Sequence, residues 1–244
     1  MTMAGHGKRF QNSKFNTPKA LIKINKKPMF IQASKSMPKS KYNIFICHKN
    51  LASKYNLKQI LKNEFSSNFT LITVKKVPQG QAKTCLLASK YLRDDDRIFI
   101  HSCDNLINFN HQILISSLKK FNGVIITTKP NKSHINNISM YGWVNIKNRI
   151  IKKITCKTRA SKNPKHDFVI TGSFAFQNKK IFVDLIKNLI KKKMKINNEY
   201  YLDMVFSNAL IEKYKIKNLI VKSYYNWGTP KELINWKKKN KRSF

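Results

Sequence analysis

Two glycines near the start of the chain are one residue apart and are followed by basic side chains. Gly5 and Gly7 precede the Lys8-Arg9 pair, and Pro18-Lys19 follows downstream. Glycine lets the backbone approach a phosphate group and present its amide N–H groups to it, while Arg and Lys supply positive charge. A plain turn explains the two glycines equally well. The basic residues favour the phosphate-binding interpretation.

A second candidate is Asp104, which follows the apolar run of residues 97–102 and Cys103. In open α/β sheets, ligands and Mg²⁺ are held just past the carboxyl ends of parallel strands. Asp104 is therefore a candidate metal ligand, and a helix cap or turn at Asp104-Asn105 is the alternative. A third motif, Asn226 to Pro230, predicts a tight turn that opens a helix.

The elements that would position these residues follow from hydrophobic patterning. Short β-branched runs alternate with segments of helical period, which is typical of βα units around a mostly parallel sheet. We predict strands over residues 43–47, 69–74, 97–102, 123–128, 140–146, 150–155, 168–176 and 218–221. We predict helices over residues 51–63, 81–92, 109–121, 179–193, 199–214 and 230–238. We expect one α/β domain over residues 1–236 and a basic C-terminal tail over 237–244.

The composition indicates a folded, very basic protein. The 244 residues include 49 Lys and Arg against 11 Asp and Glu, which gives a net charge of +38. Hydrophobic residues at 41% and aromatic residues at 11% exclude a disordered polycation. Such charge is typical of nucleic-acid binders. Because the lysines run through nearly every segment together with Asn and Ile, we favour a compositional bias and keep a nucleic-acid-binding protein as the alternative.

The cysteines and the apolar runs bear on the compartment. Cys47, Cys85, Cys103 and Cys156 form no CxxC pair, so we predict buried thiols in a reducing compartment. No apolar run approaches the roughly 18 residues of a membrane span, and the N-terminus has no signal-peptide pattern. We expect a cytoplasmic protein without a membrane partner, and a homo-oligomer is compatible with the sequence.

In this order the three motifs resemble the sugar-phosphate nucleotidyltransferase family, over about residues 2–236. The family opens with A-G-x-G-x-R-[FL], then P-K and K-P-M, and the chain matches these with Ala4 to Phe10, Pro18-Lys19 and Lys27 to Met29. Further segments similar to family motifs are Val77 to Thr84, Gly142, Lys157, Thr171-Gly172, Asn197 to Asp203 and Asn226 to Thr229. The resemblance implies a Rossmann-like three-layer αβα fold with a mixed, mostly parallel sheet. Its first strand would be cut short at Met1, and we expect a natural start a few apolar residues earlier.

The resemblance also implies an activity. An NMP group would pass from an NTP to a sugar-1-phosphate or similar phosphomonoester, with release of pyrophosphate and dependence on Mg²⁺, to supply surface polysaccharide synthesis. Catalysis would rest on Arg9 at the β- and γ-phosphates, Lys19 at the α-phosphate and acceptor, and Asp104. Asp104 and Asn226 would hold the Mg²⁺. The implied nucleotide-binding residues are Ala4, Gly5, Gly7, Lys8, Gly80 and Gln81, and the implied acceptor-binding residues are Gly142, Lys157, Thr171, Gly172 and Glu199.

Two positions depart from the family pattern. Cys156 stands where the family usually has a Glu that binds sugar hydroxyls, and Asn226 stands where Asp is commoner. These departures predict either an unusual acceptor or a catalytically degenerate relative that binds nucleotide as a sensor.

Overall fold

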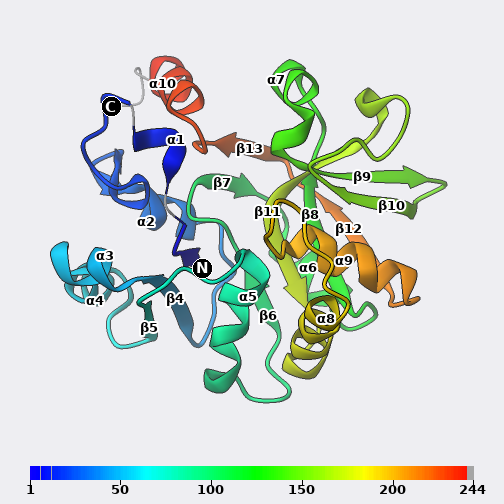
Figure 1. The fold of residues 1–244 in the computed structure, drawn as a ribbon, viewed down its shortest axis with the longest axis horizontal. Coiled ribbons are helices and arrows are strands. Elements are labelled where there is room, and N and C mark those ends of the chain that lie inside the picture. Colours follow the sequence, from blue (N-terminus) through cyan, green and yellow to red (C-terminus); the bar gives the residue numbers. More distant parts are fainter. Residues whose placement is uncertain (6, 12, 241–244) are drawn as a thin grey trace. The chain divides into compact units, whose positions relative to one another are not determined.

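The computed structural model describes residues 1–5, 7–11 and 13–240, except the side chains of Lys8 and Gln11. The chain divides into two compact units, whose elements are labelled in Figure 1. The first unit comprises Met1–Val77, His101–Asn108 and Ser223–Phe244, and the second comprises Pro78–Ile100 and Phe109–Lys222. Each unit has its own strands and its own apolar core.

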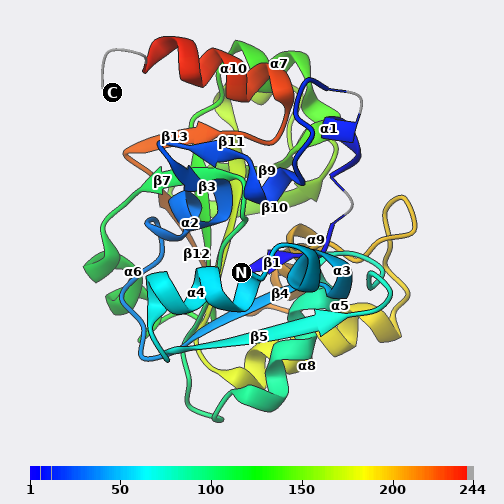
Figure 2. The ribbon, with the colours of Figure 1, turned by 90° about the vertical axis from the view of Figure 1, so that its left-hand side faces the viewer.

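A three-stranded parallel sheet forms the centre of the first unit. Its order is β1 (Thr2–Met3), β4 (Asn43–His48) and β5 (Phe69–Val74). Figure 2 shows β4 and β5 side by side, with α3 (Lys49–Lys54) and α4 (Leu57–Phe65) next to them. Because β4 is apolar and rich in β-branched residues, it forms the buried strand that the sequence predicts.

The first strand is short, as the sequence predicts. β1 contains two residues, and beyond it the backbone N–H of Ile46 donates to the carbonyl of Met1 at 3.1 Å. The amino group of Met1 donates to the carbonyl of Ile44 at 2.7 Å. A parallel bridge joins Thr2 to Ser102, so this strand has neighbours on both sides.

The helix predicted over residues 51–63 is interrupted. Asn56 has a φ of 43°, in the left-handed region, and it separates α3 from α4. Asparagine tolerates this conformation better than most residues. Leu57 and Leu61 lie one turn apart on α4 and are fully buried with Phe45 of β4. The break therefore starts a new helix with its apolar stripe on the sheet.

The remaining elements of the first unit surround a second apolar cluster that contains Phe10, Met29, Trp227 and Leu233. The strands β7 (Asn105–Asn108) and β13 (Ser223–Asn226) pair antiparallel. The other elements are α1 (Lys8–Gln11), a 3-10 helix (Lys19–Leu21), the β2 (Lys23–Ile24) and β3 (Lys27–Pro28) hairpin, α2 (Met29–Ser34) and α10 (Pro230–Lys239).

A mixed sheet forms the centre of the second unit. Its order is β10 (Ile150–Cys156), β9 (Gly142–Lys147), β11 (Phe168–Phe176), β8 (Gly123–Thr128) and β12 (Ile216–Ile220), and β6 (Ile98–Ile100) pairs with β11. β12 and β8 are parallel, and the other pairs are antiparallel. The first five residues of β8 are buried, as expected for a strand covered on both faces.

Two helices of the second unit contribute buried apolar residues to the core on its sheet. These are α8 (Lys179–Lys191) and α9 (Leu202–Ile211), and Phe206 of α9 stacks on Phe174 of β11 with ring centroids 5.3 Å apart. The shorter helices are α5 (Gln81–Leu86), α6 (His111–Ser117) and α7 (Lys132–Asn136). Three 3-10 helices cover Leu87–Tyr91, Ile138–Met140 and Pro164–His166.

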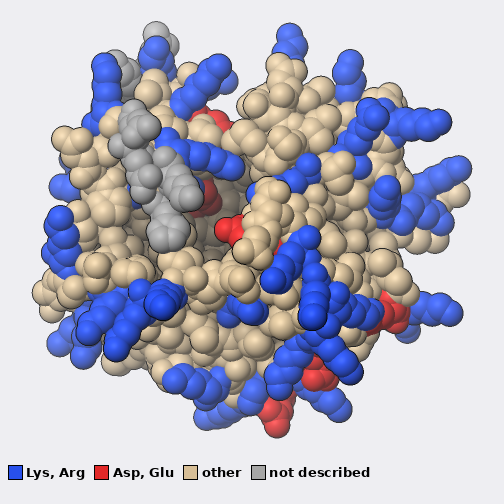
Figure 3. Space-filling model, viewed as in Figure 1, with Lys and Arg blue, Asp and Glu red and all other residues tan. Residues whose placement is uncertain are grey.

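The predicted α/β class with a mixed sheet is confirmed. The division into a domain over residues 1–236 and a basic tail over 237–244 stays a prediction. Helix α10 runs to Lys239, so residues 237–239 of that tail are helical, and residues 241–244 lie outside the described residues. None of the helices in the described ranges is long and apolar enough to cross a membrane. Figure 3 shows Lys and Arg side chains spread over the face in view.

Candidate functional site

The glycine loop of the first unit connects β1 to α1. Ala4 is buried, Gly5 is exposed, and Gly7 has a φ of 61°, which favours glycine. A Cβ atom at Gly7 would lie 3.4 Å from the Cβ atom of Lys19. The loop therefore passes directly beside Lys19, and its role in binding a phosphate stays a prediction. Arg9 is exposed on α1, and the side chain of Lys8 lies outside what the structure describes.

Lys19 and Asp104, which are far apart in the sequence, form an ion pair. Lys19 begins a 3-10 helix after Pro18, and Asp104 immediately precedes β7. Burial opposes ionisation of both groups. The charge of Asp104 nevertheless raises the pKa of Lys19, and the charge of Lys19 lowers the pKa of Asp104 below its ordinary value. Both side chains are therefore charged at neutral pH.

Arg9 acts electrostatically on this pair. Its charge lowers the pKa of both Lys19 and Asp104, more weakly than the two groups affect each other. All three residues predicted to be catalytic thus belong to one charged cluster in the first unit. Two cations and one anion leave a net positive charge there, which suits an anionic ligand such as a phosphate chain.

The pairing of β7 with β13 brings Asn226 to Asp104. Asn226 lies opposite Asn105 in this ladder, and the backbone N–H of Trp227 donates to the carbonyl of Asp104 at 2.8 Å. A Cβ atom at Gly228 would lie 3.0 Å from Oδ1 of Asn226 and 3.4 Å from Oδ2 of Asp104. A side chain at Gly228 would therefore crowd these two oxygens.

The turn after Asn226 opens α10, as the sequence predicts. Oγ1 of Thr229 accepts the N–H of Glu232 at 3.2 Å, and Pro230 occupies the first turn. Nδ2 of Asn226 donates to Oε1 of Glu232 at 2.7 Å, which directs Oδ1 of Asn226 to the N–H of Gly228 at 3.0 Å. The orientation of the amide is therefore fixed by two contacts.

The oxygens of Asp104 and Asn226 fit Mg²⁺ and do not form a complete cage for it. Mg²⁺ is usually held by one or two carboxylates, several waters and the phosphates of a substrate. Within the described part of the chain, no group of three or more His, Cys, Asp or Glu side chains could hold a metal ion. A carboxylate and an amide oxygen therefore suit an ion that arrives with a nucleotide.

In the second unit, Gly80 and Gln81 begin α5. Gly80 has a φ of 94°, and a Cβ atom there would lie 2.5 Å from the backbone N and O of Tyr200. The N–H of Tyr200 donates to the carbonyl of Gln79 at 3.0 Å, and the N–H of Ala82 donates to the carbonyl of Tyr200 at 2.9 Å. The structure thus explains Gly80 by close packing of two backbones, and its contact with a nucleobase stays a prediction.

Three predicted acceptor-binding residues, Gly142, Lys157 and Glu199, contact Tyr201 or Asp203 at the start of α9. Lys157 follows β10 with a φ of 59°, and its Nζ lies 2.8 Å from the hydroxyl of Tyr201. The same hydroxyl donates to the carboxylate of Glu199. Gly142 lies opposite Cys156 in the pairing of β9 with β10, and Asp203 of α9 contacts both residues.

Thr171 and Gly172 have contacts within β11. Thr171 is buried, and its hydroxyl donates to the carbonyl of Ile126 on β8 at 3.0 Å. Gly172 has a φ of 79° and lies where the register of β11 against β8 shifts. The positive φ and the register shift together form a β-bulge. A role for the two residues in binding the acceptor stays a prediction.

Tyr201 and Asp203 lie in the family-like segment Asn197 to Asp203, and neither residue was predicted to have a role of its own. The side chain of Asp203 hydrogen-bonds to the thiol of Cys156, and burial raises the pKa of Asp203 to about 7. The signal in the sequence was that family-like segment, which ends on Asp203. In the structure Ser207, four residues later on α9, donates to the carbonyl of Ile154 on β10 at 2.9 Å. That spacing predicts that Asp203 faces the same strand.

The nucleotidyl transferase family model matches residues 2–242. The chain belongs to the nucleotidyl transferase family. The predicted family and enzyme class are confirmed by this match, and no curated relative matches the sequence. This nucleotidyltransferase therefore brings Arg9, Lys19 and Asp104 together on a family fold.

Solved structures similar to this nucleotidyltransferase show the same fold. A nucleoside-diphosphate-sugar pyrophosphorylase from Vibrio cholerae RC9 is 14% identical, with 98% of this chain and 100% of that chain covered and a TM-score of 0.78. A putative glucose-1-phosphate thymidylyltransferase from Bacillus anthracis is 18% identical, with 96% and 91% covered and a TM-score of 0.74. An inositol-1-phosphate CTP transferase from T. maritima is 16% identical, with 95% and 89% covered and a TM-score of 0.70.

Proposed function

We propose that this nucleotidyltransferase moves an NMP group from an NTP to a sugar-1-phosphate or a similar small phosphomonoester, and that the product is an activated precursor for surface polysaccharide. The observation that carries the proposal is the charged pair of Lys19 and Asp104 beside the turn at Gly7. The structures similar in fold are named for enzymes of nucleotide sugars and of inositol-1-phosphate, which supports an acceptor of this chemical class.

The proposed reaction needs no nucleophile from the protein. An oxygen of the acceptor phosphate, ionised at neutral pH, attacks the α-phosphorus of the NTP. The bond from the α-phosphorus to the oxygen bridging it to the β-phosphate breaks, and pyrophosphate leaves with that oxygen and the bonding electron pair. The protein therefore contributes by aligning the two substrates and by stabilising negative charge.

We assign the charged groups of the first unit to the phosphates. Lys19, held by Asp104, neutralises the α-phosphate, and Arg9 on α1 binds the β- and γ-phosphates. The backbone beside Ala4, Gly5 and Gly7 approaches the nucleotide, and Lys8 adds charge to this loop. In the second unit, Gly80 and Gln81 contact the base, and Gly142, Lys157, Thr171, Gly172 and Glu199 contact the acceptor.

Asp104 and Asn226 would hold Mg²⁺, which when bound would neutralise charge on the phosphate oxygens. Asp104 is ionised at neutral pH because Lys19 lowers its pKa. Its carboxylate is therefore ready to act as a ligand without losing a proton.

Pyrophosphate release from a panel of NTPs and sugar-1-phosphates tests the proposal. We expect turnover by the unaltered chain and a loss of about 100- to 1,000-fold in kcat/KM for Asp104→Asn. Asp95→Asn is the matched control, because Asp95 is exposed outside these clusters, and it should retain full activity. Absence of turnover with every pair would contradict the proposal, and tight NTP binding without product would indicate the sensor interpretation instead.

A further inference from the structure

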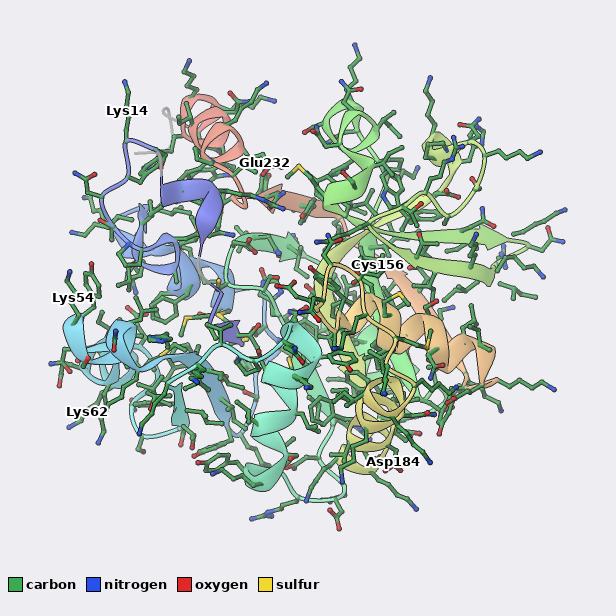
Figure 4. All side chains as sticks on the ribbon, in the orientation of Figure 1. Lys14, Lys54, Lys62, Cys156, Asp184 and Glu232 are labelled. Atoms are coloured by element: carbon green, nitrogen blue, oxygen red, sulfur yellow. The ribbon has the colours of Figure 1, made fainter. Side chains whose placement is uncertain are left out.

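The carboxyl group of Asp203 is held at the start of α9 by several contacts. Asp203 is the second residue of that helix, and Cys156 on β10, labelled in Figure 4, hydrogen-bonds to it through its thiol. The bond from Ser207, one turn later, to the carbonyl of Ile154 at 2.9 Å fixes this face of α9 on β10. The side chain of Asp203 is therefore directed by the docking of its helix.

The glycine at position 142 makes room for this carboxyl group. A Cβ atom at Gly142 would come closer to Oδ2 of Asp203 than packed atoms can approach, and it would also lie 2.8 Å from Cδ1 of Ile170. Gly142 does not have a positive φ, so backbone conformation does not explain it. We infer that this glycine is needed because the carboxyl group of Asp203 lies against it.

Asp203 lacks a cation of its own in a chain that has 49 Lys and Arg. The ion pairs among residues 1–5, 7–11 and 13–240 involve Asp104, Glu64, Asp94 and Glu212, and not Asp203. Lys157 is the cation that acts on Asp203, and its ammonium group donates a hydrogen bond to the hydroxyl of Tyr201 at 2.8 Å. A carboxylate shielded from solvent without a paired cation is unfavourable, so its placement here calls for an explanation.

The carboxyl group also has unused hydrogen-bonding capacity. A carboxylate offers about four lone-pair sites, and the carboxyl group of Asp203 is hydrogen-bonded to the thiol of Cys156 and to its own backbone N–H. Asp203 as a whole residue keeps part of its surface exposed. Beside it lie Lys157, which suits a phosphate, and Tyr201 and Glu199, which suit hydroxyl groups.

We propose that Asp203 is a specificity-determining residue, whose carboxyl group accepts a hydrogen bond from a hydroxyl group of the acceptor while Lys157 contacts the acceptor's phosphate. This inference rests on the proposed function and narrows its acceptor to a polyhydroxylated phosphomonoester. The thiol of Cys156 then orients the carboxyl group instead of contacting the substrate. A phosphomonoester without hydroxyl groups would be a poor acceptor, because the carboxyl group would then lack this hydrogen-bond partner.

Steady-state kinetics with α-glucose-1-phosphate, and with its singly deoxygenated analogues, tests the inference. For Asp203→Asn and Asp203→Ala we expect the acceptor KM to rise about 10- to 100-fold, with the NTP KM within twofold of the unaltered chain. Asp184→Asn is the matched control, because it removes the same charge from an exposed position on α8 (Figure 4). Asn keeps the volume of Asp203, so it separates chemistry from packing.

The analogues supply a readout that a purely structural role would not change. For one deoxy analogue, the KM should be the same with the unaltered chain and with Asp203→Ala. That analogue lacks the hydroxyl group that Asp203 would bind, so removing the carboxyl group costs nothing further. Equal acceptor KM values for Asp203→Asn and Asp184→Asn would overturn the inference alone. If the unaltered chain releases no pyrophosphate with any NTP and phosphomonoester, the proposed function fails and the inference falls with it.

Discussion

At the scale of single residues, the ion pair of Lys19 and Asp104 differs from the others in its burial. Its side chains are 19% and 21% exposed, whereas those of Lys27 and Glu64 are 47% and 28% exposed. Solvent screens the second pair more strongly. The first pair therefore contributes to stability as well as to the proposed chemistry.

Replacing Lys19 by Met should expose the energetic difference between these pairs. We expect Lys19→Met to lower the free energy of unfolding by about 2 kcal/mol, because it leaves the carboxylate of Asp104 without its cation. Lys27→Met should lower it by less than about 1 kcal/mol. Urea unfolding at pH 7 measures both. Equal effects of the two substitutions would contradict the assignment.

The pH dependence of the Lys19 effect follows from the lowered pKa of Asp104. A carboxyl group whose pKa is lower in the folded state stabilises the protein above its ordinary pKa, and this contribution is lost as the pH falls through the folded value. The difference between the unaltered chain and Lys19→Met should therefore shrink below about pH 4. A difference that stays constant from pH 7 to pH 3 would be inconsistent with the pair.

Asp203 should show the opposite dependence, because burial raises its pKa from 3.8 to about 7. The free energy of unfolding is therefore highest, as far as Asp203 is concerned, below about pH 4. It falls by at most about 4 kcal/mol as the pH rises through 7. Asp203→Asn should thus gain stability relative to the unaltered chain between pH 5 and pH 8. Unfolding midpoints measure this, and a constant difference would contradict the raised pKa. The neighbouring titratable groups are Cys156, Lys157, Glu199 and Tyr201.

At the scale of elements, the start of α5 depends on glycine. Gly80→Ala places a Cβ atom 2.5 Å from the backbone of Tyr200 at a φ of 94°, so we expect a loss of about 2–4 kcal/mol in unfolding free energy. Gly5→Ala is the control, because a Cβ atom there meets nothing within 4 Å. Its effect should stay within about 0.5 kcal/mol in urea unfolding. A Gly80→Ala variant as stable as Gly5→Ala would contradict the packing.

Hydrophobic patterning predicted most helices and strands. It failed where the backbone conformation of a single residue decides where a helix begins or ends. The strands over residues 69–74, 123–128 and 168–176 match β5, β8 and β11 because apolar and β-branched runs encode buried strands. The helix over 51–63 was predicted without its break, because the left-handed conformation of Asn56 depends on tertiary packing. The helix over 199–214 was placed too early, since α9 begins at Leu202 after the turn at Asn197 and Asn198.

The sequence predicted only part of the candidate site, because some of its residues are recognised only by their contacts in the folded chain. Arg9, Lys19 and Asp104 were identified from glycine spacing, position after a strand and family resemblance, and the structure joins them in one cluster. Asp203 was quoted in a family-like segment without a role, because its contacts with Gly142 and Cys156 join residues that are distant in sequence. Charge composition gave no guidance, because basic residues are spread over the whole chain.

At the scale of the whole molecule, the central claim is that an acceptor phosphate attacks the α-phosphorus and pyrophosphate leaves. The most direct measurement is phosphorus NMR of the products made by the full chain from an NTP and glucose-1-phosphate whose phosphate oxygens carry oxygen-18. We expect a diphosphate product with the label in its bridging oxygen, together with unlabelled pyrophosphate. Orthophosphate or labelled pyrophosphate, or no product beside tightly bound NTP, would contradict it.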